Sequence, residues 1–250
     1  MTDLFDQRAV ADTGAGDYGL SGDMKKTQYV LQLLGSPACS ETLKCVLIAA
    51  EQGMEMNTGS IEMSDLESAE FNAVSEFGMA PALKENDFFT AGSKAITEYI
   101  NARGLGTSII PKNVTLAAEQ ETWIDKSRQQ AGPAIKAFVG EITGESGDTA
   151  AARSQLESVL DELNDQLGKD KHVIGKNYSM ADIHWTADMH LLSLTSGADM
   201  ITSRPNISNW LQSMRDKKSN CGQSLKACSL LPTVEDIKAN KLNNVVIDDF

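Results

Sequence analysis

The stretch LLGSPACSETLKCVLIAAEQG, residues 33–53, decides the fold of this chain. It begins within an apolar run that is typical of a buried strand, and the Gly-Ser-Pro-Ala sequence that follows is a turn signal. The apolar residues beyond this turn recur at helical spacing and predict a helix over residues 40–52, which Gly53 ends. That spacing is carried by Leu43, Val46, Leu47 and Ala50. We therefore expect a strand, a tight turn and a helix that begins directly after Cys39.

The neighbouring residues extend this unit into a small sheet. Residues 27–34 and 55–61 have the composition of strands, and two further short strands are expected on either side of Asp87. A capping box that begins at Ser64 predicts a short helix, and residues 93–102 carry another helical stripe. This order of strands and helices is typical of a mixed sheet covered by helices.

The second half shows no convincing strand pattern after residue 112 and is expected to be all-helical. A long helix is expected over residues 116–138, with a kink near Gly132-Pro133 because proline lacks the amide hydrogen that a helix uses. Ser179 begins a second capping box, which predicts the start of a later helix. The expected parts are a flexible N-terminal extension (1–26), an α/β domain (27–103), a linker (104–113), an all-α domain (114–231) and a C-terminal tail (232–250).

Composition and charge restrict the partners. The 250 residues carry a net charge of −13, which repels phosphate backbones and anionic lipid surfaces and so argues against nucleic acid and membrane partners. The longest apolar runs are too short to span a bilayer, and the N-terminus lacks the basic start and apolar block of a secretory signal. The 4 cysteines form no Cys-x-x-Cys pair, which favours a reducing compartment. We therefore expect a soluble cytoplasmic protein.

Several segments in register resemble the glutathione transferase superfamily over about residues 27–230. They are the opening stretch quoted above, FNAVSEFGMAPAL (71–83), FFTAGSKAITEYI (88–100), NYSMADIHW (177–185) and RPNISNWLQSM (204–214). The resemblance implies the glutathione transferase architecture, in which an α/β thioredoxin-like N-terminal domain precedes an all-α C-terminal domain. It also implies glutathione as co-substrate, no metal, a small-molecule electrophile as second substrate, and a homodimer.

The resemblance places the catalytic residue at the N-terminus of the first helix, where counting back from Gly53 reaches Cys39. This matches the cysteine classes of the family, similar to omega and beta. Unpaired amides and the helix dipole favour negative charge there, so a Cys39 thiolate can attack a disulfide or form a mixed disulfide with glutathione. Two alternatives stay open: Ser36 or Ser40 donates its hydroxyl hydrogen to a bound thiolate, or Cys39 is a small packing residue. An inward-pointing Glu41 would oppose thiolate formation.

The resemblance also implies contacts to glutathione. Pro81 matches a cis-proline that turns the backbone of Ala80 outward, so that a thiol peptide can pair with it like an added strand. The alternative is an ordinary trans-proline at a strand start. Ser93 matches a serine that holds the γ-glutamyl carboxylate at a helix N-terminus. The acidic or amide residue that precedes this serine in the family is Gly92 here, so the partner of the glutathione amino group is missing or comes from elsewhere.

The second substrate is expected to bind between the two domains. The candidate residues on the long helix are Trp123, Ser127, Arg128 and Gln130. The leading hypothesis is a glutathione-dependent transferase or thiol transferase that acts through Cys39, with conjugation and reductive dehalogenation as variants. The alternative is a non-catalytic, transferase-like binding or scaffold protein, which the glycine at position 92 and the two terminal extensions motivate.

Overall fold

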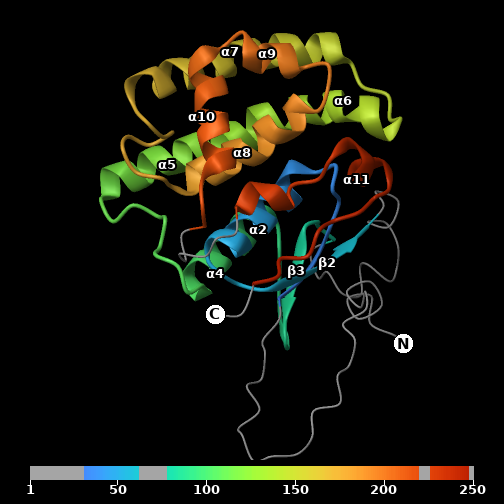
Figure 1. Ribbon diagram of the computed structural model, residues 1–250, viewed down its shortest axis with the longest axis vertical. Coiled ribbons are helices and arrows are strands. Elements are labelled where there is room, and N and C mark those ends of the chain that lie inside the picture. Colours follow the sequence, from blue (N-terminus) through green and yellow to red (C-terminus); the bar gives the residue numbers. More distant parts are fainter. Residues whose placement is uncertain (1–30, 62–77, 220–225, 248–250) are drawn as a thin grey trace, which may run out of the picture.

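The computed structural model describes residues 31–61, 78–219 and 226–247. The extension expected over residues 1–26 and the short helix expected after Ser64 lie outside the described residues. The described parts form a sheet domain and a helical domain that lie against each other (Figure 1). This is the expected architecture, an α/β thioredoxin-like domain followed by an all-α domain.

The described part of the sheet has its strands in the order β2-β1-β3-β4. β1 (Leu31–Gly35) pairs in parallel with β2 (Met56–Ser60) and antiparallel with β3 (Ala82–Glu85), and β3 pairs antiparallel with β4 (Phe88–Ala91). Parallel neighbours need a long crossover connection, and the helix that follows β1 supplies it. The expected strands are therefore confirmed where the structure describes them.

Helices α2 (Ser40–Glu51) and α4 (Ser93–Arg103) cover the sheet domain and pack on each other. α2 is buried on nearly all sides because it also packs on α8 (Met180–Ser193) of the helical domain, as Figure 1 shows. The expected helices over residues 40–52 and 93–102 end within one residue of the observed ones. Both helices start at the same edge of the domain, where the strands of the sheet lead into them.

The long helix expected over residues 116–138 is present in three sections. α5 (Val114–Lys126) leads into a π-helical turn, η2 (Ser127–Ala131), and then into α6 (Gly132–Thr143). In the π-helical turn the amide of Gly132 donates to the carbonyl of Ser127, five residues back. Pro133 follows directly and has no amide hydrogen to donate, so the expected break lies where the sequence predicted it.

Further helices follow α6 in the helical domain. α8 begins at the expected capping box, in which Ser179 and Asp182 bond each other's backbone amides. The carboxylate of Asp182 also accepts a hydrogen bond from the indole of Trp210, at 3.0 Å. This buried carboxylate therefore ties the start of α8 to a later helix. The other helices are α7 (Thr149–Lys169), α9 (Ala198–Thr202) and α10 (Pro205–Asp216).

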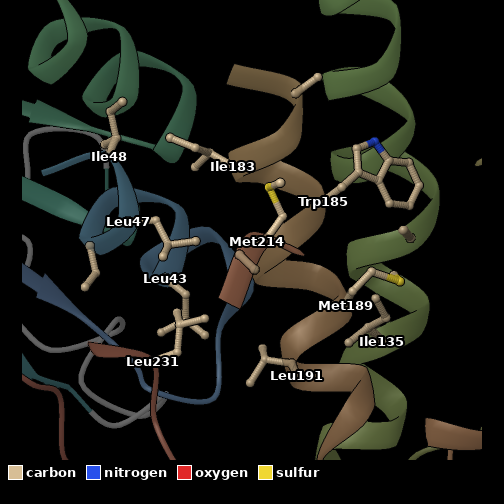
Figure 2. Packing of buried hydrophobic residues seen from close by; sticks show 14 of the residues in the cluster. Leu43, Leu47, Ile48, Ile135, Ile183, Trp185, Met189, Leu191, Met214 and Leu231 are labelled. Carbon is tan, nitrogen blue, oxygen red and sulfur yellow. The ribbon is translucent and has the colours of Figure 1, made fainter. Parts of the chain in front are cut away.

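A continuous apolar core joins the two domains. Figure 2 shows Leu43 and Leu47 of α2 on the side of that helix that faces α8, with Ile183 and Met214 beyond them. These side chains are all at least nine-tenths buried. Full burial of such a side chain contributes about 2 kcal/mol, so the interface between the domains is part of the folding core.

The C-terminal segment differs from the expected tail over residues 232–250. After a 3-10 turn (Ala227–Leu230) it forms a short helix, α11 (Val234–Lys238), which packs on α6. Val245 then forms a bridge with Met56 at the edge of β2, and the amide of Thr58 donates to Asn244 at 2.8 Å. The sequence did not predict that this segment packs on the rest of the protein, because the segment is polar and contains few apolar residues.

Candidate active site

The main cavity of the described structure lies between the domains and has a volume of about 790 Å³. α2, the Ala80-Pro81 turn, the start of α4 and η2 form one end of it, and α6, α8 and α11 form the other. Six residues expected from the sequence line the first end, which we call the thiol end. They are Ser36, Cys39, Ser40, Ala80, Gly92 and Ser93.

Cys39 stands at the N-cap of α2, where its backbone carbonyl accepts the first hydrogen bonds of the helix, from Thr42 and Leu43. Its side chain makes no capping hydrogen bond, is half-buried and lines the cavity. The hydroxyl of Ser36 accepts from the amide of Ala38 at 3.2 Å and so stabilises the turn before the helix. The geometry thus offers Cys39 to a ligand at a helix N-terminus.

Cys45 provides the contrast with Cys39. It lies one and a half turns further along α2 and is fully buried, and its thiol donates to the carbonyl of Glu41 at 3.4 Å. Burial, followed by the nearby charge of Glu41, raises the pKa of the Cys45 thiol well above its ordinary value. Cys45 therefore has the character of a packing cysteine, as expected for its position among apolar residues.

The peptide bond between Ala80 and Pro81 is cis, as expected. The carbonyl of Pro81 accepts a hydrogen bond from the amide of Gly92 at 2.8 Å. This bond joins the cis turn to the start of α4, so the two expected glutathione contacts, Ala80 and Ser93, line the same end of the cavity. Gly92 adopts a φ of 83°, a conformation that side chains rarely take, and it contributes no side chain to the site.

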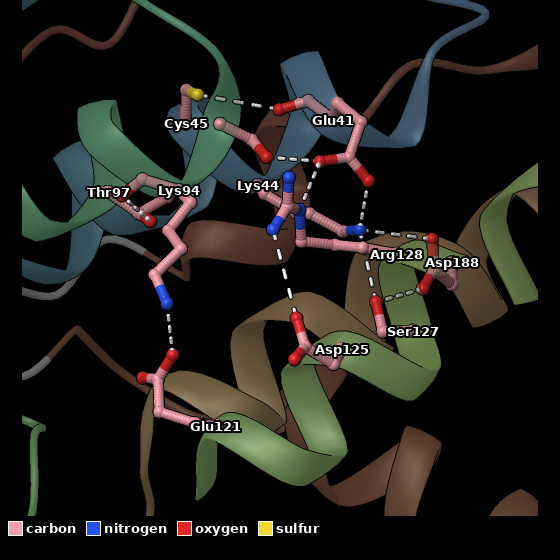
Figure 3. Close-up of polar contacts among 11 residues, drawn as sticks. Glu41, Lys44, Cys45, Lys94, Thr97, Glu121, Asp125, Ser127, Arg128 and Asp188 are labelled. Carbon is pink, nitrogen blue, oxygen red and sulfur yellow. Dashed lines mark hydrogen bonds and ion pairs between the residues drawn. The ribbon is translucent and has the colours of Figure 1, made fainter. Parts of the chain in front are cut away.

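Glu41 points inward, and its carboxylate lines the thiol end (Figure 3). It accepts a hydrogen bond from the hydroxyl of Ser93 and pairs with Lys44 at 2.5 Å. Arg128 Nε lies 3.9 Å from the same carboxylate. From the sequence, Glu41 was expected only to oppose formation of the Cys39 thiolate. The structure shows that it also contacts Ser93, a residue expected to bind glutathione.

Behind Glu41 lies a buried ionic network that the sequence did not reveal. Lys44 is fully buried and contacts Ser127 at 3.1 Å and Asp188 of α8 at 3.5 Å, and Ser127 in turn donates to Asp188 at 2.5 Å (Figure 3). Burial raises the pKa of Asp188, and the charge of Lys44 opposes that rise. The one available signal was a lysine within the otherwise apolar stretch of α2, Leu-Lys-Cys-Val-Leu-Ile.

Three of the four residues expected to line the electrophile pocket do not do so. Trp123 packs edge to face on Trp185, with ring centroids 6.1 Å apart, inside the helical domain. Ser127 is fully buried and hydrogen-bonds within the ionic network. Arg128 does line the cavity, whereas Gln130 is exposed and is not part of its lining.

The second end of the cavity, which we call the apolar end, is formed by residues that the sequence did not reveal. They come from α6, α8 and α11. The aliphatic ones are Ile135, Val139, Ile142, Leu191 and Ile237, and the polar residues Lys136, Thr143 and Lys238 lie beside them. The chain thus provides a polar end beside a thiol and an aliphatic end, which suits a peptide thiol next to an apolar second substrate.

Metal-binding clusters and membrane-spanning helices are both absent from the part of the chain that the structure describes. In residues 31–61, 78–219 and 226–247, no group of three or more His, Cys, Asp or Glu side chains could hold a metal ion. None of the helices in these same ranges is both long enough and apolar enough to cross a membrane.

Comparison with known proteins identifies the class of protein. No protein-family model matches the chain. Glutathione S-transferase F13 of Arabidopsis thaliana is 31% identical over 158 residues, which cover 58% of this chain and 71% of that protein. Glutathione S-transferase PARB of Nicotiana tabacum is 24% identical over 192 residues, or 72% of this chain and 90% of that protein.

A solved structure agrees with these relatives. The crystal structure of glutathione transferase F7 from Populus trichocarpa superimposes with a TM-score of 0.65 at 26% identity, and the match covers 75% of this chain and 94% of that one. The fold and the cavity between the domains give this protein the two-domain architecture of a glutathione transferase. It belongs to the glutathione S-transferase family and is an enzyme of that kind. F13 and F7 are plant transferases of the F series, and the matches to them do not support the expected likeness to the omega and beta classes.

Proposed function

We propose that this protein uses glutathione as its co-substrate and acts through Cys39. The observation that carries the proposal is the position of the Cys39 side chain, which lines the thiol end of the cavity at the N-terminus of α2. Ala80, after which the cis peptide bond occurs, and Ser93, at the start of α4, line the same end. An extended peptide thiol can pair with the backbone of Ala80 while its carboxylate binds at the N-terminus of α4.

The proposed thiol transfer has two balanced steps. The Cys39 thiolate attacks the glutathione sulfur of a mixed disulfide, so that a new sulfur–sulfur bond forms, the old one breaks, and the other thiol leaves as a thiolate. A second glutathione thiolate then attacks the Cys39–glutathione disulfide, which releases glutathione disulfide and restores the Cys39 thiolate. The helix N-terminus stabilises the negative sulfur that each step creates or consumes.

Conjugation is a second reaction of the same site. Here the glutathione thiolate attacks an electrophile at the apolar end and displaces its leaving group, and position 39 contributes a hydrogen bond or a charge beside the attacking sulfur. Ser36 and Ser40 also line the thiol end and can donate a hydroxyl hydrogen to that sulfur. Conjugation therefore depends less on the cysteine than thiol transfer does.

A comparison of three proteins tests the proposal: the wild type, Cys39→Ala and Cys39→Ser. We expect the wild type to be retained on immobilised glutathione, to reduce hydroxyethyl disulfide and to conjugate chlorodinitrobenzene. Cys39→Ala should lose disulfide reduction by at least about a hundredfold, because the nucleophile is gone. Cys39→Ser should also lose disulfide reduction but keep conjugation. Unchanged disulfide reduction in Cys39→Ala would refute the role of Cys39.

Two features of the thiol end oppose the binding of glutathione: Gly92 has no side chain, and the carboxylate of Glu41 already accepts a hydrogen bond from the hydroxyl of Ser93. Absence of retention on immobilised glutathione, together with absence of turnover with both substrates, would refute the proposed use of glutathione.

We also propose that the protein forms a homodimer. Met79, Phe88 and Phe89 are large apolar residues with 49%, 44% and 37% of their surfaces exposed, and they lie on or beside the edge strand β4. Exposed apolar side chains on an edge strand are a common site of association. Light scattering should give twice the chain mass for the wild type and a lower mass for Phe89→Glu. A wild type of single-chain mass at micromolar concentration would refute the dimer.

A further inference from the structure

The γ-glutamyl end of glutathione is a zwitterion, in which an ammonium and a carboxylate are attached to the same carbon atom. A site that binds the carboxylate therefore also holds the ammonium within a few ångströms, where an anionic acceptor would stabilise it. On the proposed function, Ser93 and the amides at the start of α4 bind the carboxylate. Gly92, the residue next to Ser93, has no side chain with which to bind the ammonium.

Glu41 presents a carboxylate at the required place. It lies on α2, and its carboxylate is in hydrogen-bond contact with the hydroxyl of Ser93. Its side chain keeps 26% of its surface exposed and lines the cavity. A ligand carboxylate at Ser93 would therefore have its own ammonium next to Glu41.

The other acidic residue in the lining of this cavity, within the described chain, lies far from Ser93. Glu145 follows the end of α6, whereas the first residue of α6, Gly132, lies beside Glu41, with 3.8 Å between its ideal Cβ position and Glu41 Oε1. The 12 residues of α6 span about 18 Å at 1.5 Å per residue. Glu145 is therefore out of reach of the γ-glutamyl end.

The ionic network keeps Glu41 in place and leaves one of its oxygens to a ligand. Lys44 binds Oε1 at 2.5 Å, but it also pairs with the buried carboxylate of Asp188, so its charge is shared between two anions. Oε2 faces Ser93 and lies 3.9 Å from Arg128. When a zwitterion binds, the hydroxyl of Ser93 can turn from Glu41 to the ligand carboxylate, and Oε2 then accepts from the ligand ammonium.

We propose that Glu41 binds the γ-glutamyl ammonium of glutathione, in place of the acidic or amide side chain that Gly92 lacks. The acceptor thus comes from the helix that carries Cys39 and not from the helix that carries Ser93. This inference rests on the proposed use of glutathione, but it does not depend on Cys39 as nucleophile. It makes Glu41 a specificity residue that selects thiols with a free amino group.

The test compares two ligands on the intact protein by calorimetry. One is glutathione, and the other is glutaryl-cysteinyl-glycine, which has the same atoms except that hydrogen replaces the amino group. Wild type should prefer glutathione by roughly tenfold or more, as expected for a hydrogen bond between charged groups. Glu41→Gln should bind glutathione roughly tenfold more weakly and glutaryl-cysteinyl-glycine unchanged, so that the preference disappears.

Two controls separate this outcome from a general defect. Glu145→Gln, at the opposite end of the cavity, should keep the full preference. Glu41→Asp keeps the negative charge but has a side chain shorter by one methylene group. Its preference for glutathione should therefore lie between those of wild type and Glu41→Gln. Glu145→Gln should also show the urea unfolding midpoint of wild type within the error of measurement.

Three results would overturn the inference. If Glu41→Gln binds glutathione more tightly than wild type does, Glu41 competes with the ligand carboxylate for the hydroxyl of Ser93. Equal weakening of both ligands would give Glu41 a merely structural role. Absence of binding of both ligands by wild type would remove the proposed function together with this inference. If Cys39→Ala loses turnover but keeps the preference for the amino group, both the inference and the proposed role of Cys39 stand.

Discussion

The two ends of the cavity are built in different ways. The thiol end consists of residues from short local motifs, such as Cys39 at a helix start and Ala80 before a cis-proline, and it is backed by buried charges. The apolar end joins residues from α6, α8 and α11, which lie far apart in the sequence, as Ile135 and Ile237 do. On the proposed function, the difference means that the glutathione site is encoded by local motifs, whereas the site of the second substrate depends on packing between distant helices.

The largest expected effect comes from breaking the buried network behind the thiol end. Lys44→Ala leaves the buried carboxylate of Asp188 without its cation, and such a loss typically costs about 3 to 5 kcal/mol. Urea unfolding should show this loss of stability. Lys94→Ala is the matched control, because Lys94 and its partner Glu121 keep 44% and 40% of their side-chain surfaces exposed, and such surface pairs contribute about 1 kcal/mol or less. Equal effects of the two substitutions would contradict this account.

Acidification should change the stability of the fold in opposite directions through His190 and Asp188. His190 Nε2 donates to the carbonyl of Pro232, where the C-terminal segment begins, and burial lowers the pKa of His190 from 6.5 to about 4. Between these values the unfolded chain binds a proton that the folded chain does not, so stability falls as the pH is lowered, by about 1.4 kcal/mol per pH unit. Asp188 has the opposite sign, because its raised pKa lets the folded chain take up a proton first.

Urea titrations at pH 7, 5.5 and 4.5 measure these contributions. His190→Gln preserves a donor to Pro232 and should reduce the loss of stability on acidification. Asp188→Asn should increase that loss, since it removes the group that gains from protonation. Identical pH profiles for wild type and both variants would contradict the assignment of these two groups.

Substitutions at the apolar end should change the KM for the second substrate and leave the KM for glutathione unchanged. Ile237 of α11 is nearly fully buried and lines the cavity. Ile237→Ala should raise KM for chlorodinitrobenzene roughly tenfold, because the smaller side chain covers less of the apolar substrate, and leave KM for glutathione unchanged. Val246→Ala, at an exposed residue of the same C-terminal segment, is the control and should change neither constant. A rise in KM for glutathione with Ile237→Ala would show that the two ends are not separate.

The smallest effect is expected where the C-terminal segment meets the sheet. The side chain of Asn244 accepts from the amide and the hydroxyl of Thr58, at 2.8 and 3.0 Å. Asn244→Ala should cost about 1 kcal/mol, the typical net contribution of a buried hydrogen bond. Hydrogen exchange at Thr58 should become faster, while exchange within α8 stays as in wild type. Unchanged protection at Thr58 would show that the segment does not cover this edge.

The same contrast explains what could be predicted from sequence. The α2 helix, the capping box at Ser179 and the break before Pro133 were all predicted, because each depends on the chemistry of neighbouring residues. Trp123 and Ser127 were wrongly expected in the cavity, because the pattern of one long helix does not tell which face meets another domain.

The contacts of Glu41 could not be predicted for a related reason. Its partners Ser93 and Arg128 come from other helices, and only the packed structure brings the three together. The docking of the C-terminal segment was missed as well, because its polar composition resembles that of a tail, and its described buried apolar residues, such as Ile237 and Val245, are few and widely spaced.

The most direct test of this account is intact-mass spectrometry, followed by peptide mapping, after incubation with glutathione disulfide. The Cys39 thiolate should attack the disulfide, release one glutathione thiolate and leave one glutathionyl group on the chain, on Cys39. Cys45, which is buried, should stay unmodified in the folded protein. A wild type in which Cys39 stays unmodified while another cysteine carries the adduct would contradict the account.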